Sequence, residues 1–440
     1  KNICKKIFGD DLGKVPYIMP GFKLSKKAAD IYKKNPRVKG LILLNHGIFT
    51  FGNTAKESYE RMIKYVTIAE KFINKHKRKN IRHRRFNFNY DSNDISLKIR
   101  KSAYDLSERK WILNFCNSKK IAEFTSSKEL LNLINKGPVT PDHVIRIKPN
   151  LLILKNNNLI DKNIKKFAFQ YSKYFSKYKK FVKGSIISDL IPRIIILPGK
   201  GIFSLGRNFK ESQISLDIFL SVIKSIDWAK RIGNFKSIPK KEIFKMEYWP
   251  LERAKISNKK ESNLSGNVVV VTGGCGTIGI ATAKEFINEG AEVVLLDNDK
   301  KNIASIPKNI KSKSIIINCD LTNNLMVKKA LKKIINTYGG IDIIVSNAGK
   351  AFEGEMMNVK AETIKKSYEI NFYSHQYISQ EAVKIFKKQR LGGLILFNIS
   401  KQSINPGKNF GPYGLPKSST LFLMKQYVLE YSKYGIRFNG

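Results

Sequence analysis

From residue 267 to the end of the chain, short apolar runs alternate with longer stretches of helical pattern. The apolar runs are NVVVVT (267–272), VVLLD (293–297), SIIIN (314–318), IDIIVS (341–346), GLILFNIS (393–400) and IRFN (436–439). The helical stretches are 277–289, 323–337, 361–389 and 413–433. Continuous apolar runs are typical of strands that are buried on both faces, with helices as the crossovers between them. This pattern predicts an α/β fold with a doubly wound parallel sheet.

The turn after the first of these strands is GGCGTIG (273–279), and a helix follows it directly. The spacing G-x-G-x-x-G is formed by Gly274, Gly276 and Gly279. Glycines allow the backbone to approach a pyrophosphate, and the helix N-terminus offers amides that bind it. Asp297 ends the next strand, where a carboxylate accepts hydrogen bonds from a ribose 2′-hydroxyl and repels a 2′-phosphate. We therefore expect a Rossmann-like site for NAD rather than NADP, a preference that Lys300 and Lys301 weaken.

Further polar features follow in order along the same segment. They are Asn347-Ala348-Gly349 after the fourth strand, Asn371 in the next helix, Ser400 after the fifth strand, and Tyr413 with Lys417 four residues later. Residues four apart lie on one helix face. Because Pro416 is tolerated only in the first turn of a helix, we expect Tyr413 at a helix start. Each residue alone has a structural explanation, but their joint occurrence predicts a catalytic set.

The segment from about 265 to 440 resembles the short-chain dehydrogenase/reductase family, whose motifs are the features above and an Asp before a small apolar residue, here Asp320-Leu321. The resemblance implies that Tyr413 is the general acid/base and that Lys417 favours its phenolate and holds the nicotinamide ribose. It also implies that Ser400 binds the substrate oxygen and that Asn371 holds a water in the proton path. The implied cofactor-binding residues are Gly273, Gly276, Ile278, Gly279, Asp297, Asp320, Leu321, Asn347, Ala348, Gly349, Tyr413 and Lys417.

The N-terminal half contains one phrase twice, LLNHGIFTFGNTAKES (43–58) and LPGKGIFSLGRNFKES (197–212), at a constant offset of 154 positions. The repeat predicts a duplicated αβ unit in which His46 of the first copy is replaced by Lys200. In the first copy we expect residues 46–52 to form a turn. The expected elements are strands at 41–44 and 193–197 and helices at 54–73, 164–182 and 208–230.

PYIMPG (16–21) and the first copy of the repeat resemble class II aldolases, in which the histidine before glycine is the third ligand of a catalytic zinc. The resemblance implies that His46 binds zinc, which acts as a Lewis acid on a cleaved ketose phosphate. The other histidines and an acidic base precede residue 1 in the family pattern, so we expect an incomplete zinc site. Because the sequence starts at Lys1 rather than Met and stops at GIRFNG within an expected strand, we expect a fragment cut at both ends. Protonated Lys200 is no zinc ligand. Our hypothesis is that the first copy kept the chemistry and the second became a scaffold.

GPVTPDHVIR (137–146) and FKMEYWPLE (244–252) resemble the middle region of bifunctional rhamnulose-1-phosphate aldolase/short-chain dehydrogenases. This resemblance covers essentially the whole chain. It implies cleavage of a deoxyketose 1-phosphate to dihydroxyacetone phosphate and lactaldehyde, with the lactaldehyde as the second substrate. The expected domains are an aldolase-like end at 1–75, a degenerate aldolase-like repeat at 76–255 and the dehydrogenase at 265–440. Two alternatives stay open, a dehydrogenase with an inactive aldolase-like scaffold and a basic binding protein without activity.

The net charge of +46 is by itself typical of nucleic-acid binding. The lysines are spread over nearly every segment, and the densest run (75–85) contains no base-reading motif. We therefore interpret the charge as a compositional bias and expect no nucleic-acid partner. The four cysteines form no CxxC pair, and no apolar run approaches the roughly 20 residues of a membrane span. We expect a cytoplasmic homo-oligomer that acts on a sugar phosphate and a hydroxy-aldehyde and has no membrane partner.

Overall fold

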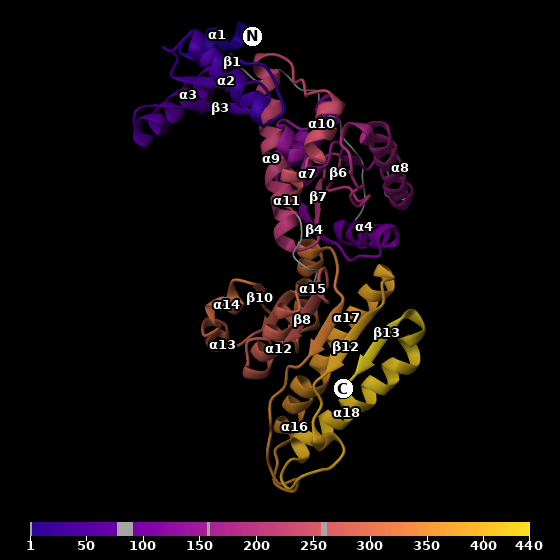
Figure 1. Cartoon of the computed structure of the whole chain (residues 1–440). Helices are drawn as coiled ribbons and strands as arrows, with labels where there is room; N and C mark the ends of the chain where they lie inside the picture. The colour runs from indigo at the N-terminus through magenta and orange to yellow at the C-terminus, as the bar shows by residue number, and fades with distance from the viewer. Residues whose placement is uncertain (1, 77–90, 156–158, 257–261) are drawn as a thin grey trace.

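The structure, a computed structural model, describes residues 2–76, 91–155, 159–256 and 262–440. These residues form three sheets, which follow one another along the chain and along the long axis of the molecule (Figure 1). Most of the basic run at 75–85 and part of the polar stretch at 251–266 lie outside the described residues.

The first sheet has three strands in the order β1-β2-β3. The elements of this unit are α1 (Asn2–Phe8), β1 (Leu12–Val15), α2 (Phe22–Lys34), β2 (Gly40–Leu43), β3 (Gly47–Thr50) and α3 (Ala55–Lys75). β2 pairs with β3 as an antiparallel hairpin in which Leu43 lies opposite Gly47. The expected turn at 46–52 is therefore wrong over residues 47–50, which extend and pair back along β2. The reversal needs only three residues, with Asn45 in the left-handed region at φ 64°.

The second sheet has four strands in the order β4-β7-β6-β5. The elements of this unit are α4 (Ser92–Ser107), β4 (Ile112–Cys116), α5 (Lys119–Thr125), α6 (Lys128–Ile134), η1 (Pro141–His143), α7 (Val144–Ile147), β5 (Leu152–Ile153), α8 (Ile160–Tyr178), η3 (Lys179–Phe181), β6 (Ile194–Leu197), β7 (Gly201–Gly206), α9 (Phe209–Ile232), α10 (Lys240–Glu247) and α11 (Pro250–Ala254). The hairpin β6–β7 followed by α9 repeats the hairpin β2–β3 followed by α3, with Leu197 opposite Gly201. The duplicated unit is thus strand–strand–helix.

The third sheet has six strands in the order β10-β9-β8-β11-β12-β13, and all five neighbouring pairs are parallel. The elements are β8 (Val268–Thr272), α12 (Thr277–Asn288), β9 (Glu292–Asp297), α13 (Lys300–Ala304), α14 (Lys308–Lys311), β10 (Ser314–Asn318), α15 (Asn324–Tyr338), β11 (Ile343–Ser346), α16 (Ala361–Tyr368), η4 (Glu369–Tyr373), α17 (Ser374–Gln389), β12 (Gly393–Phe397), η5 (Lys401–Ser403), α18 (Gly411–Tyr431), η6 (Ser432–Tyr434) and β13 (Ile436–Asn439). Alternate residues of β8 enter separate cores on the two faces. The predicted doubly wound parallel sheet is confirmed. The single helix expected at 361–389 is interrupted by the π-helical turn η4.

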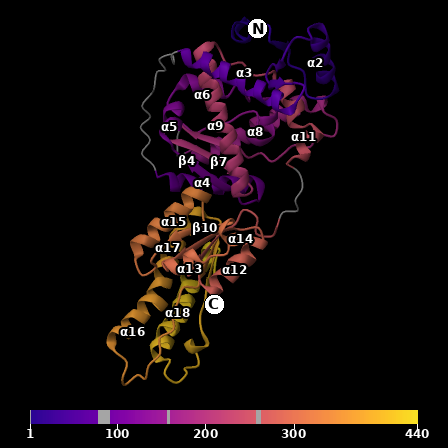
Figure 2. The same ribbon diagram turned by 90° about the vertical axis from the view of Figure 1, so that its left-hand side faces the viewer.

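The second and third units share a hydrophobic core. Leu97 of α4 and Ile112 of β4 belong to the cluster that covers one face of the parallel sheet. The buried guanidinium of Arg100 pairs with Asp342 at 2.7 Å and also donates to the backbone oxygen of Gly266 at 2.7 Å. A buried charge is tolerated only when it is paired and hydrogen-bonded, so this contact requires a fixed interface. Figure 2 shows α4 lying against the ends of α15 and α17.

Candidate dinucleotide site and catalytic residues

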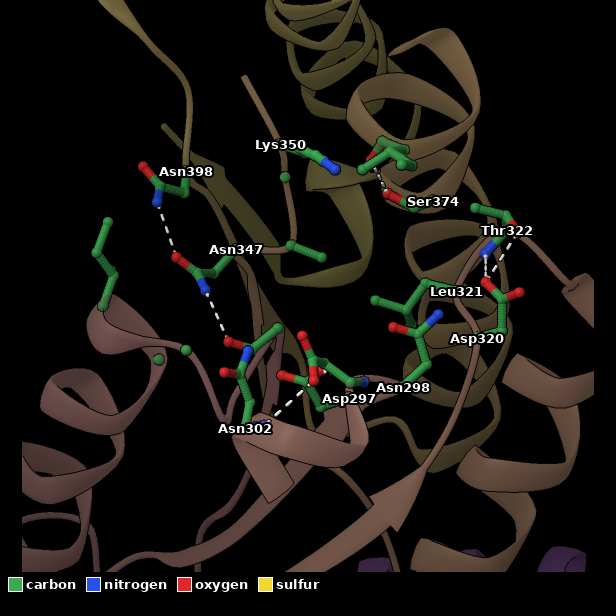
Figure 3. Close-up of a pocket in the computed structure, with 18 of the residues that line it drawn as sticks. Asp297, Asn298, Asn302, Asp320, Leu321, Thr322, Asn347, Lys350, Ser374 and Asn398 are labelled. Carbon is green, nitrogen blue, oxygen red and sulfur yellow. Dashed lines mark hydrogen bonds between the residues drawn. The ribbon is translucent and has the colours of Figure 1, made fainter. Parts of the chain in front are cut away.

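A cavity of about 630 Å³ lies at the carboxyl ends of the parallel strands, where the strand order reverses between β8 and β11. Open parallel sheets bind ligands at such a reversal. The sequence-predicted residues that line this cavity are Gly273, Gly276, Ile278, Gly279, Asp297, Asp320, Leu321, Asn347, Ala348, Gly349, Tyr413 and Lys417. Figure 3 shows part of this lining, with side chains from the end of β9 and from the segments that follow β10 and β11 turned toward a common space. Asn371 and Ser400 are not among its lining residues.

The glycine-rich turn brings the start of α12 close to the strands. Gly273 has φ 57°, a conformation that favours glycine. A Cβ on Gly274 would lie 2.8 Å from the backbone oxygen of Val271, so the turn packs against β8 without space for a side chain. A Cβ on Gly276 would meet only the Gly273 backbone oxygen, at an ordinary 3.5 Å, and no side chain caps α12, which begins at Thr277. The first amides of α12 are therefore available to an anionic group in the cavity.

Asp297 fastens the end of β9 to the glycine-rich turn. Its Oδ2 accepts a hydrogen bond from the Cys275 amide at 2.9 Å, and its Oδ1 accepts one from the Asp299 amide at 3.0 Å. Asp297 and Asp299 both line the cavity, whereas Lys300 and Lys301 do not. This end of the cavity is therefore lined by two carboxylates and by neither lysine.

The Asn347 side chain joins three strand ends. Its Nδ2 donates to the backbone oxygen of Thr272 at 3.0 Å, and its Oδ1 accepts from Asn398 Nδ2 at 2.8 Å (Figure 3). Thr272 Oγ1 accepts the amides of Asn347 and Ala348 at 2.8 and 3.0 Å. The sequence interpretation missed Thr272 and Asn398. Both residues lie at strand ends, next to motifs that the sequence analysis recognised. This position is the only sequence signal that could have identified them.

Tyr413 and Lys417 lie on the first two turns of α18, which begins at Gly411. Pro416 is in the second turn rather than the first, where its missing amide would have reached Pro412. The Lys417 side chain is buried, and its Nζ donates to the Asn398 backbone oxygen at 2.9 Å. Burial lowers the pKa of Lys417 to about 8. Its ammonium therefore carries a positive charge at pH 7, and it lies 5.8 Å from the Tyr413 ring centre.

Asn371 lies in the π-helical turn η4 and contacts the backbone that follows Gly349. Its Oδ1 accepts from the Lys350 amide at 3.1 Å, and its Nδ2 donates to the Lys350 oxygen at 2.8 Å. The backbone oxygen of Asn371 accepts from Thr420 Oγ1 of α18 at 2.8 Å. These bonds hold the loop after β11 against α18, which carries Tyr413.

Ser400 is the N-cap of the 3₁₀ turn η5, and its hydroxyl accepts a hydrogen bond from the Gln402 amide at 3.3 Å. This is the capping role that a serine at a strand end commonly has. In the described contacts the hydroxyl is directed to its own turn, and the expected contact with a substrate oxygen stays a prediction.

His375 is a buried residue next to the site that the sequence interpretation did not single out. Its Nδ1 lies 2.6 Å from Ser346 Oγ at the end of β11. Burial, together with the charge of Lys417, lowers the pKa of His375 to about 3. The imidazole is therefore neutral at physiological pH and does not compete with Tyr413 as a proton donor.

His46 lies in the β2–β3 turn of the first unit. Its ring stacks on Tyr17 with centroids 5.3 Å apart, and its Nε2 lies 3.2 Å from the backbone oxygen of Ile18. Among the described residues, no group of three or more His, Cys, Asp or Glu side chains is arranged to hold a metal ion. The residues present therefore do not form a zinc site around His46.

Comparison with known families gives three consecutive matches. Residues 1–73 match the class II aldolase and adducin N-terminal domain, residues 91–256 match the second domain of class II aldolases, and residues 267–440 match the short-chain dehydrogenases. The uncharacterized oxidoreductase YuxG of Bacillus subtilis is 29% identical over 478 aligned positions, which cover 100% of this chain and 67% of that protein.

Other relatives match the third unit alone. Sorbose reductase SOU1 of Candida albicans is 31% identical over 40% of this chain and 66% of its own length, and L-fucose dehydrogenase of Oryctolagus cuniculus is 29% identical over 40% and 61%. A crystal structure of a short-chain type dehydrogenase/reductase from Mycobacterium marinum is 27% identical with a TM-score of 0.39, covering 40% of this chain and 73% of that chain. Consecutive segments of the chain are thus similar to class II aldolase domains and to a short-chain dehydrogenase domain, which indicates an enzyme.

Proposed function

We propose that the third unit is an NAD-dependent oxidoreductase that interconverts a small hydroxy compound and its carbonyl form. The observation that carries the proposal is that Tyr413 and Lys417 line the same cavity as the glycine-rich turn and Asp297. A bound nicotinamide cofactor supplies the hydride chemistry. Two relatives of this unit are named for reactions of sorbose and fucose, which supports a polyhydroxy or hydroxy-carbonyl substrate.

In this proposal Tyr413 gives its hydroxyl proton to the substrate oxygen during reduction and takes it back during oxidation. The ammonium of Lys417 favours the phenolate because it lies close by in a buried setting. Asn371 positions the Lys350 backbone beside this pair and holds a water in the proton path, and Ser400 orients the substrate oxygen. The uncapped start of α12 binds the pyrophosphate, and the other predicted cofactor-binding residues surround the dinucleotide.

The exchange Tyr413→Phe tests the chemistry because it removes only the hydroxyl. NADH-dependent reduction of lactaldehyde should fall by about 10²–10⁴-fold, the usual contribution of a general acid. NADH binding, measured by fluorescence titration, should stay within about twofold, since most of the cofactor contacts are elsewhere. Tyr434→Phe is the matched control, because Tyr434 is exposed and does not line the cavity. Activity retained in Tyr413→Phe would mean that another group carries the proton.

The preference for NAD has support in the charge of the cavity near Asp297. Two carboxylates, Asp297 and Asp299, line that end and oppose a 2′-phosphate, while Lys300 and Lys301 stand outside the lining. Asp297→Asn keeps one oxygen to accept a backbone amide and removes the charge, so the preference for NADH over NADPH should shrink several-fold. Equal affinities of the wild-type chain for the two cofactors would contradict the preference.

For the aldolase domains the candidate reaction is cleavage of rhamnulose 1-phosphate to dihydroxyacetone phosphate and lactaldehyde, with His46 as a zinc ligand. Its support is the family match of residues 1–73 and the accessible turn that carries His46. No cleavage step follows from the described residues, because they form no three-ligand group. We therefore expect chain 1–440 to bind zinc weakly, with the same zinc content in His46→Ala and Lys200→Ala. Tight zinc binding that either exchange abolishes would overturn this expectation.

An inactive aldolase-like scaffold remains the alternative for the aldolase domains, and a basic binding protein without activity is the remoter one. The proposal also places the protein in the cytoplasm, with domain limits at 1–75, 76–255 and 265–440. We propose a homo-oligomer because Leu415, Phe422 and Leu429 are exposed seven residues apart on one face of α18. No helix within the described ranges is long and apolar enough to cross a membrane.

A further inference from the structure

The second unit contains a cavity of about 460 Å³ that the site above does not use. Its lining comes from the carboxyl end of β7, the ends of α4, α7 and α11 and the start of α9. The turn that carries Lys200 is at the opposite end of the β6–β7 hairpin. This volume is typical of small-molecule sites and exceeds what a single inorganic ion fills.

The charges that line this cavity are mostly positive. The cations are Arg109, Arg146, Lys148, Arg193, Arg207 and Arg253, and the carboxylates are Asp189, Glu211 and Glu247. Asp189 pairs with Arg193 at 2.5 Å and with Lys148 at 3.3 Å, so one carboxylate serves two cations. Arg146 and Arg253 form no salt bridge with a described residue. The lining therefore has an excess of positive charge that an anionic ligand would neutralise.

Lys148, at the wall of this cavity, combines a strained backbone conformation with a buried side chain. Its backbone has φ 62° and ψ 167°, a combination that residues other than glycine rarely adopt. Its side chain is 4% exposed, donates to the backbone oxygen of Asp189, and lies with its Nζ 4.2 Å from the Tyr171 ring centre. Burial lowers the pKa of Lys148 to about 8. Strained backbone conformations and buried groups with shifted pKa values both cluster at functional sites.

A buried polar network continues the cavity wall. The Tyr171 hydroxyl bonds to Ser188 Oγ at 2.8 Å, to Glu247 Oε1 at 2.5 Å and to the Tyr248 hydroxyl at 2.7 Å. Oε2 of Glu247 has no hydrogen-bond partner among the described residues, although the nearby Tyr174 hydroxyl influences its ionisation. Burial raises the pKa of Glu247 to about 7. This network fixes the wall beside Lys148, whose Nζ lies over the Tyr171 ring.

We propose that this cationic cavity binds a small phosphorylated polyhydroxy compound. The arginines provide the planar donor sets that match phosphate oxygens. The Ser188 and Ser215 hydroxyls provide partners for the hydroxyl groups of the same ligand. The cavity is formed entirely within the second unit, so the proposal is independent of the dehydrogenase reaction and of zinc at His46. The second copy of the repeat then belongs to a ligand-binding domain instead of a scaffold.

The test is isothermal titration calorimetry of the complete chain with sn-glycerol 3-phosphate. Saturating NADH is present so that the dinucleotide cavity is occupied. Wild-type protein should bind one equivalent. Arg146→Gln and Arg253→Gln should each weaken binding about tenfold, as expected for the loss of a charge-assisted contact. Lys162→Gln removes one charge from the exposed surface of α8 and should change the affinity less than about twofold. NADH affinity in each variant reports that the chain is folded.

Each other outcome would overturn the proposal. Absence of binding by the wild type at millimolar concentration would exclude the ligand class. An equal loss in Lys162→Gln would mean non-specific attraction to a basic protein. Glycerol binding as tightly as glycerol 3-phosphate would remove the role of the phosphate, and lactate binding more tightly would assign the cavity to a carboxylate instead.

Discussion

The two copies of the repeated strand–strand–helix unit have the same backbone but different surroundings. In both, the hairpin closes through a left-handed residue, Asn45 at φ 64° and Gly199 at φ 72°, and a glycine follows two positions later. Both helices begin with the same reciprocal cap. Thr54 accepts the Glu57 amide at 3.1 Å, and Asn208 accepts the Glu211 amide at 2.9 Å. Local sequence therefore encodes the unit in each place.

The surroundings of the hairpins differ because only the second has a further strand. β7 pairs with β6 on one side and with β4 on the other, and all its residues are buried. β3 pairs with β2 only, among the described residues, and two of its four residues are exposed. Phe203 is 0% exposed and lies 4.7 Å from the ring centre of Phe115, whereas its counterpart Phe49 is 55% exposed. The same residue type thus contributes differently to stability in the two copies, because the neighbouring strand buries it in only one of them.

The same difference extends to the polar chemistry. The first copy places His46 on Tyr17 at the turn of its hairpin, whereas the second copy has Lys200 there. The charged cavity of the second copy lies at the other end of its hairpin, around Lys148 and Glu247. A duplicated unit can therefore keep its fold while its polar groups gather at opposite ends.

The largest expected difference between the two copies is the stability lost when the equivalent phenylalanines, Phe203 and Phe49, are each replaced by alanine. Phe203→Ala should lower the free energy of local opening of the second copy by about 3–5 kcal/mol, because it leaves a cavity in a closed core. Phe49→Ala should cost less than about 1 kcal/mol, since its ring already contacts water. Amide hydrogen exchange of peptides from 194–232 and from 40–75 measures the two openings separately.

Separate readouts are needed because a chain with three sheets need not unfold in one step. Phe203→Leu is the matched control, and it should cost less than Phe203→Ala since it fills most of the space. A similar cost for the alanine variants of Phe49 and Phe203 would mean that β3 is covered in solution.

A smaller effect is expected from pH, and it should differ between the two copies of the repeat. Burial raises the pKa of Glu247 from 4.5 to about 7, so the folded state binds its proton more tightly than the unfolded state. The resulting stability is complete below about pH 4.5 and is lost as the pH rises through 7. Glu247→Gln should remove this slope in exchange rates of peptides from 194–255.

The first unit provides the contrast for this pH dependence. Its Asp11 has a pKa lowered chiefly by the hydrogen bond from Tyr65, which opposes the effect of burial. That contribution is lost only as the pH falls below the ordinary value of 3.8, outside the range of Glu247. A slope between pH 5 and 7 in both units, or its persistence in Glu247→Gln, would show that other groups are responsible.

The parallel sheet and most of the cavity lining could be predicted because their signals are local. Apolar runs, a glycine turn and motifs at strand ends each need only a few consecutive residues. Strand β3 was missed because Gly47 and Gly52 punctuate a run whose pairing with β2 depends on tertiary context. The π-helical turn at Asn371 was missed because it forms where the loop after β11 and Thr420 meet the helix. No helix-breaking residue marks it.

The polar residues that were missed share one property. Asn398 reaches Asn347 from 51 positions away, so no spacing rule connects them before the sheet forms. The cationic cavity of the second unit is an extreme case, because its lining comes from many separate segments. Its five arginines and one lysine were indistinguishable in the sequence from the general excess of basic residues.

The smallest expected difference concerns the helix caps. Thr54→Ala and Asn208→Ala should each cost about 1 kcal/mol, because each removes one acceptor from an otherwise unpaired helix amide. The two costs should be nearly equal despite the different burial of the hairpins, since Glu57 and Glu211 each also accept a backbone amide, from Asn53 at 2.7 Å and from Arg207 at 3.1 Å. Thr54→Ser and Asn208→Asp preserve the acceptor and should cost little. Hydrogen exchange at the first turns of α3 and α9 measures the effect. Costs that differ by more than about 1 kcal/mol would mean that the caps depend on tertiary packing, and the repeated unit would then not be locally encoded.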